Sequence, residues 1–164
     1  MILKKQSNIE KYSLTYFENL TNIFKKIDLK KISLLAKLFQ QCRNKNRKIF
    51  VIGNGGSAVN ASAMSNDLGF DIFKKTKKKP FRIVSLTDNN AISTAISNDV
   101  GFENIFLSQL KMEYKKNDLL LVMSVSGNSK NLINSAKWVR SKNGKVFGIL
   151  GQDGGILKKT CNNS

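Results

Sequence analysis

The chain has 164 residues, of which 41% are hydrophobic, and a formal net charge of +17. This length and apolar content suit one domain of ordinary size with a real core. The sequence has no apolar run of 18 residues and no apolar stretch near its N-terminus. It therefore predicts a cytoplasmic protein without a membrane-spanning helix or a secretory signal.

The high positive charge is spread over the whole chain rather than concentrated in one stretch. Lys74–Lys79 is the only true lysine cluster, and it lacks interleaved aromatic residues that could stack on bases. We interpret it as a solvated crossover loop, and we expect no nucleic-acid partner.

Two amphipathic helices are predicted before the first strand. Ile9–Ile27 has apolar residues at alternating spacings of three and four, and Asp28 can cap a second helix that ends near Arg43–Arg47. The first helix carries more apolar surface than a small sheet edge needs, which favours contact with another subunit. We therefore expect residues 1–46 to serve oligomerisation and residues 47–164 to form the binding domain.

The first strand is predicted at 48–52 and is followed at once by the glycine loop, Gly53–Ser57. A helix from about Ala58 to Leu68, rich in small residues, comes next. The loop matches neither the dinucleotide fingerprint nor the Walker loop, so a nucleotide is not indicated.

Further strands are predicted at 81–86, 119–123 and 145–150, with helical segments between them. Strands that alternate with helices at this spacing predict a parallel sheet with helices on both faces. The expected fold is thus a three-layer α/β/α sandwich. In such sheets, ligands bind beyond the carboxyl ends of the strands.

The serine loop, Ser124–Ser129, follows the buried apolar run 119–123 and precedes a helix. Unpaired N–H groups and the positive end of the helix dipole favour an anion there, and Ser124, Ser126 and Ser129 can add hydroxyl donors. The simpler alternative is an ordinary serine N-cap. Because both the glycine loop and the serine loop leave carboxyl ends of strands, they can face one site.

These motifs, together with Ser97-Asn98-Asp99 and Gly151–Gly155, resemble the SIS (sugar isomerase) domain family, and within it the phosphoheptose isomerases. The resemblance implies a tetramer and an aldose–ketose isomerisation of sedoheptulose 7-phosphate that supplies surface polysaccharide. It implies that Ser124, Ser126 and Ser129 hold the phosphate, and that Asn54, Gly55 and Ser57 line the sugar. It also implies that Asp99 helps to position the sugar and that Asp67 stands where the family has its catalytic glutamate.

The sequence departs from the family pattern at functional positions. A metal-binding histidine of many members is Ala63 here, so the resemblance implies no certain cofactor, although some relatives use zinc. The sequence has no histidine at all, and it ends before the family's last strand and the helix that carries its acid histidine. The expectation is a chain that lacks this segment and has lost activity.

Three hypotheses follow: a phosphosugar isomerase, a non-catalytic SIS module that binds a sugar phosphate or a protein, and a nucleic-acid binder suggested by charge alone. For Asp67, the alternative is an ordinary carboxylate on a helix surface.

Overall fold

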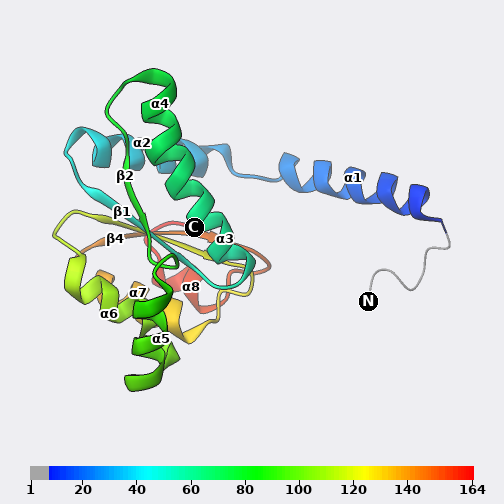
Figure 1. The fold of residues 1–164 in the computed structure, drawn as a ribbon. Coiled ribbons are helices and arrows are strands. Elements are labelled where there is room, and N and C mark those ends of the chain that lie inside the picture. Colours follow the sequence, from blue (N-terminus) through cyan, green and yellow to red (C-terminus); the bar gives the residue numbers. More distant parts are fainter. Residues whose placement is uncertain (1–7) are drawn as a thin grey trace. The chain divides into compact units, whose positions relative to one another are not determined.

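The computed structural model describes residues 8–164, and its internal contacts divide the chain into two compact units. The first unit ends at Ser33 and contains α1 (Ile9–Lys25), drawn in blue in Figure 1. Asn8 caps this helix, since its Oδ1 accepts a hydrogen bond of 2.9 Å from the N–H of Glu10. α1 buries none of its residues.

The second unit, Leu34–Ser164, is built on four parallel strands in the order β2-β1-β3-β4. The strands are β1 (Lys48–Gly53), β2 (Arg82–Ser85), β3 (Leu119–Ser124) and β4 (Lys145–Leu150). Their pairing sets Val51 opposite both Ser85 and Leu121. Because all neighbours are parallel, every carboxyl end lies at the same edge, as the sequence predicted.

Helices cover both faces of this sheet, which confirms the three-layer α/β/α prediction (Figure 1). One face carries α2 (Leu29–Asn44) and α3 (Gly56–Ser65), and the other carries α6 (Ile105–Glu113), α7 (Lys130–Ser141) and α8 (Gly155–Thr160). The remaining helical segments are η2 (Asn66–Asp71), α4 (Ile72–Thr76), α5 (Asn90–Asp99) and η3 (Phe102–Asn104).

The alternation of side chains along β1 and β3 explains the two faces. Ile49 and Val51 point to the α2 and α3 side, whereas Phe50 and Ile52 point to the α6 and α7 side. Every residue of β3 is buried. A strand buried on both faces needs a continuous apolar run, and the run Leu119–Met123 meets that need.

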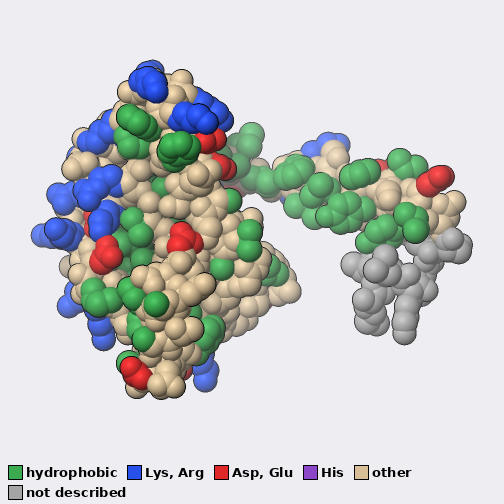
Figure 2. Space-filling model, in the orientation of Figure 1, with side chains coloured by type: hydrophobic (Ala, Val, Ile, Leu, Met, Phe, Trp, Pro, Cys, Tyr) green, Lys and Arg blue, Asp and Glu red, His purple; other side chains and the backbone are tan. Residues whose placement is uncertain are grey.

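The helix after the glycine loop is longer than predicted. A π-helical turn, η2, continues α3 into α4, so Lys74 and Lys75 are helical rather than part of a loop. Aromatic residues also accompany the lysines, because the Nζ atoms of Lys74 and Lys77 lie 5.8 Å from the ring centres of Phe70 and Phe73. The prediction of a loop was therefore wrong for Lys74 and Lys75, and the two aromatic residues precede the lysine cluster rather than interrupt it. Figure 2 shows basic and hydrophobic side chains gathered around the α4 end of the sheet unit.

Within residues 8–164, none of the helices combines the length and the apolar character that a membrane span requires.

Candidate functional site

The serine loop leaves the carboxyl end of β3 and enters α7. Ser124 is buried, and its Oγ accepts a hydrogen bond of 3.0 Å from the N–H of Gly127, while Ser126 Oγ accepts one of 3.3 Å from the N–H of Asn128. These contacts fold the loop into a tight turn just before the N-terminus of α7.

Ser129 occupies the N-cap position of α7, but its side chain makes no capping hydrogen bond. The N–H of Ile133 donates a hydrogen bond to the Ser129 carbonyl oxygen, and the N–H of Leu132 donates one to Asn131 Oδ1. In this part of the chain the first two N–H groups of α7 therefore keep no acceptor, as is usual for the start of a helix. Together with the Ser129 hydroxyl, they are donors that an anion can use.

The glycine loop brings a second helix N-terminus to the same edge of the sheet. A Cβ on Gly53 would lie 2.8 Å from the backbone of Ser57, so the chain can turn this sharply only with glycine there. The N–H of Ser57 donates to the Asn54 carbonyl oxygen at 3.0 Å. The turn sets Asn54 and Ser57 toward the serine loop.

A side-chain amide pair joins the two loops. Asn54 Nδ2 donates to Asn131 Oδ1 at 3.0 Å, and Asn131 Nδ2 donates to Asn54 Oδ1 at 2.9 Å. Asn131 lies in the first turn of α7 and is only 2% exposed. Asn131 was not predicted as a site residue, since an asparagine inside a helix carries no sequence motif of its own.

The turn Gly151–Gly155 packs against the serine loop from the other side. Gly127 has φ +67°, and a side chain there would overlap the Gly154 carbonyl group. The N–H of Ile156 donates to Asn128 Oδ1 at 3.1 Å. Three loops that are far apart in the sequence thus form one rigid wall.

A cavity of about 700 Å³ opens between the glycine loop and the serine loop. Five of the predicted site residues line it, namely Asn54, Ser57, Ser124, Ser126 and Ser129. The further lining residues are Gly56, Val59, Asn60, Met123, Val125 and Leu132. No lining residue is charged, so an anion bound here would be held by hydroxyl groups, N–H groups and the helix dipole.

The other predicted site residues lie elsewhere. Gly55 is the N-cap of α3 but does not line the cavity. Asp67 is exposed in η2 and accepts a hydrogen bond of 3.2 Å from Asn66. At a helical rise of about 1.5 Å per residue, it lies roughly 16 Å along the helix from Gly56. Asp99 is exposed at the end of α5 and accepts a hydrogen bond of 2.8 Å from Asn98. Their roles stay predictions.

The residues present do not fit a zinc ion at the family's position. Ala63 offers no ligand, and Asp67 alone cannot complete a coordination shell. Within residues 8–164, no three Cys, Asp or Glu side chains are close enough together to hold a metal ion.

A second polar cluster lies at the carboxyl end of β2 and was not predicted. The Asp88 carboxylate accepts hydrogen bonds from Ser62 and from Ser85, the latter at 3.0 Å. The Thr87 hydroxyl joins the same network, 2.6 Å from Ser85 Oγ. The cluster ties β2 to α3 and places a carboxylate at the carboxyl edge of the sheet.

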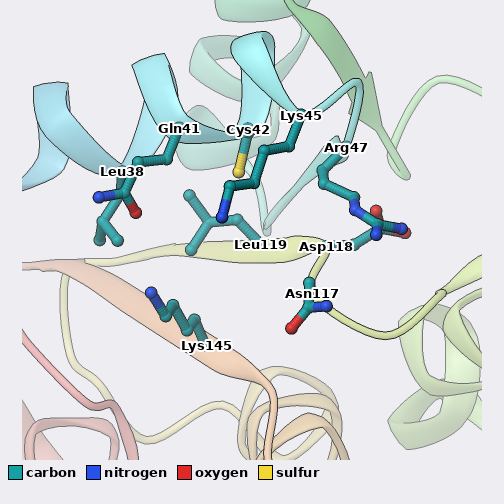
Figure 3. A pocket seen from close by; sticks show the side chains of 9 residues that line it. All are labelled: Leu38, Gln41, Cys42, Lys45, Arg47, Asn117, Asp118, Leu119 and Lys145. Atoms are coloured by element: carbon teal, nitrogen blue, oxygen red, sulfur yellow. The ribbon is translucent and has the colours of Figure 1, made fainter.

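A smaller cavity of about 240 Å³ lies at the opposite, amino end of the strands (Figure 3). The side chains of Lys45, in the turn after α2, and of Lys145, on β4, approach it, and the Cys42 thiol lies beside the Lys45 side chain (Figure 3). Burial raises the pKa of Cys42, and Asp118 raises it further, while Lys145 and Arg47 lower it. This cavity shares no residue with the loops and belongs to another region of the fold.

The fold is a parallel α/β sheet with a cavity between two loops at its carboxyl edge. The model of the SIS domain matches residues 15–151, and the chain belongs to the SIS domain family.

Curated relatives and solved structures resemble it over most of its length. It is 35% identical to the phosphoheptose isomerase of Campylobacter jejuni over 133 residues, which cover 81% of this chain and 70% of that protein. It is 34% identical to the phosphoheptose isomerase of Aliarcobacter butzleri over 158 residues, covering 95% and 81%. The structure of phosphoheptose isomerase from Neisseria gonorrhoeae superposes with a TM-score of 0.80 at 29% identity, covering 94% of this chain and 83% of the other.

Proposed function

We propose that this chain binds a phosphorylated sugar in the cavity between the glycine loop and the serine loop. One observation carries the proposal: the Ser129 hydroxyl does not cap its own helix, yet it lines the cavity beside the unpaired first N–H groups of α7. A phosphate group can accept all of these hydrogen bonds, and the positive end of the helix dipole favours its charge.

The substrate we propose is a heptose phosphate, because the relatives at 34–35% identity are phosphoheptose isomerases. In this assignment Ser124, Ser126 and Ser129 hold the phosphate, and Asn54 and Ser57 contact the sugar. Gly55 and Asp99 would contribute as the family resemblance implies. The reaction would interconvert sedoheptulose 7-phosphate and glycero-manno-heptose 7-phosphate in the cytoplasm, as a supply for surface polysaccharide.

Such an isomerisation needs a base that removes the proton next to the carbonyl group and an acid that protonates the enediolate oxygen. Asp67 is the proposed base. The sequence contains no histidine, and Asp67 does not line the cavity within this chain. We therefore propose that the chain alone binds the sugar phosphate but isomerises it slowly or not at all. The position of Asp67 outside the cavity favours, as the alternative function, a module that binds a sugar phosphate without catalysis.

We also propose a homo-oligomer, with a tetramer as the expected size. α1 exposes large apolar side chains along its length: Phe17 and Phe24 are each 60% exposed and Leu14 is 65% exposed. Apolar surface of this extent on one helix is typical of an interface between subunits.

The test of the binding proposal is calorimetric titration of the purified chain with sedoheptulose 7-phosphate and with unphosphorylated sedoheptulose. We expect saturable binding of the phosphate ester alone. Equal affinity for the two sugars, or binding of neither, would contradict the proposal.

A further inference from the structure

The amide pair between Asn54 and Asn131 fixes the orientation of both side chains. The Leu132 N–H donates to Asn131 Oδ1 at 2.9 Å, so the oxygen of that amide must face the start of α7. Asn131 Nδ2 must then face Asn54, where it donates at 2.9 Å to Oδ1, and Asn54 Nδ2 returns a hydrogen bond of 3.0 Å. The orientation of Asn54 therefore follows from a backbone N–H of α7.

This orientation decides what Asn54 offers to the cavity. An asparagine amide has two N–H donors and two acceptor lone pairs. Asn54 uses one donor and one lone pair on Asn131, which leaves one of each for a ligand. A sugar hydroxyl group can use both, because it donates and accepts at once.

Both loops have anchors in addition to the amide pair. Both hydrogen bonds end on the Asn54 side chain, whereas the glycine loop has its own bond from the Ser57 N–H to the Asn54 carbonyl oxygen. α7 is anchored through buried Leu132 and Val139. Removing the Asn131 amide would free the Asn54 side chain to rotate while both elements stay packed.

We propose that Asn131 is a positioning residue that orients Asn54 toward the sugar part of the ligand. This inference rests on the proposed function, because it assumes a sugar in the cavity. Asn131 does not touch the ligand in this scheme and acts only through Asn54. Its loss should therefore weaken sugar recognition and spare recognition of the phosphate group by the serine loop.

The experiment compares Asn131→Ala, Asn54→Ala and the double variant by calorimetry, with sedoheptulose 7-phosphate and with inorganic phosphate as separate ligands. We expect each single variant to bind the sugar phosphate about 3- to 10-fold more weakly. The double variant should be no weaker than Asn54→Ala, since the two residues act as one unit. Affinity for inorganic phosphate should stay within about twofold of the original chain.

Asn134→Ala is the matched control, because Asn134 lies on the same helix and is half-buried, with a single long hydrogen bond of 3.4 Å to the Glu103 carbonyl oxygen. It should bind both ligands normally. If Asn131→Ala does not fold, Asn131→Leu replaces it. Leucine has nearly the same size as asparagine and adds no charge near the bound phosphate, and this variant should show the same selective loss.

Unchanged sugar-phosphate affinity in the Asn131 variant would overturn the inference, and so would equal losses for both ligands, which indicate a structural role.

A readout independent of binding is the side-chain NH2 signal of Asn54 in NMR spectra. Asn131→Ala should abolish its protection from solvent exchange, and persistent protection would also overturn the inference. If the original chain binds neither ligand while this signal responds as expected, the proposed function fails and the orienting role of Asn131 stands.

Discussion

The carbonyl oxygen of Gly127 accepts a hydrogen bond of 3.0 Å from the N–H of Leu157, which joins the serine loop to the first turn of α8. Gly127 has φ +67°, and a side chain there would overlap the Gly154 carbonyl group. Because this contact joins the loop after β3 to the turn after β4, the shape of the proposed anion site depends on both loops.

The first prediction concerns Gly127. We expect Gly127→Ala to lower the free energy of unfolding by about 1–3 kcal/mol or more. The alanine would have to adopt a left-handed backbone conformation, and its Cβ would overlap the Gly154 carbonyl group. It should also abolish phosphate binding. Urea unfolding measures the first effect. Gly69→Ala is the control, since an added Cβ there would come no closer than 3.8 Å to its neighbours and Gly69 lies in η2, outside the cavity. A stable Gly127→Ala variant would show that the turn can move away.

The second prediction separates a phosphate-binding serine from a capping serine. Ser129→Ala should weaken sugar-phosphate binding by about 1.5–3 kcal/mol, the usual effect of losing a hydrogen bond to a charged group. Its melting temperature should hardly change, because the Ser129 side chain makes no cap. Calorimetry and thermal unfolding of the same samples give both values. Lower stability with normal binding would support the simple N-cap instead. Ser141→Ala, at the other end of α7, should change neither.

The third prediction concerns catalysis. In a coupled isomerase assay, we expect the purified chain to convert sedoheptulose 7-phosphate very slowly or not at all. Loss of general acid–base catalysis typically costs about 10²–10⁴-fold, and Asp67 is also one methylene shorter than the family's glutamate. Asp67→Asn should therefore change little. Robust turnover that Asp67→Asn abolishes would contradict this, and comparison with Asp88→Asn would show whether the carboxylate at the end of β2 takes part.

The fourth prediction concerns assembly. Sedimentation should report a homo-oligomer, and Phe17→Glu with Phe24→Glu should shift it to smaller species, because charges would lie in an apolar interface. Asn22→Glu adds charge to the same helix on the face roughly opposite the apolar stripe, and it should leave assembly intact. A monomer at micromolar concentration for the original chain would contradict the proposed oligomer.

The fifth prediction is a loss of stability in alkaline solution. Burial raises the pKa of Cys161 from 9.0 to about 11, and burial together with Asp118 and Cys42 raises that of Tyr114 from 10.0 to about 12. Since the unfolded chain releases these protons at lower pH, the stabilisation is complete below pH 9 and is lost as pH rises from there through the folded pKa values. Urea midpoints measured at rising pH should fall. Cys161→Ala should make the urea midpoint fall less steeply with rising pH, whatever its effect on stability at neutral pH. An unchanged pH dependence in this variant would show that the Cys161 thiol does not cause the loss of stability.

The sequence by itself determined the arrangement of layers and the edge at which a ligand would bind. The continuous apolar run Leu119–Met123 is typical of a strand that is buried on both faces of a parallel sheet, and such sheets place ligands at the carboxyl ends. The glycine loop and the serine loop could be identified because a sharp turn and a helix N-terminus each have a local sequence signature.

Only the tertiary structure decided which side chains meet at that edge. Asn54 and Asn131 form their pair across two strands that are neighbours in the sheet but distant in sequence, and no periodicity reports such a pairing. Asp67 belongs to a helix that begins at the cavity, but a continuous helix carries each later residue away from its start at about 1.5 Å per residue. Local pattern therefore predicts where a helix begins and which face it buries, whereas the packing of distant segments decides what lies within hydrogen-bond reach.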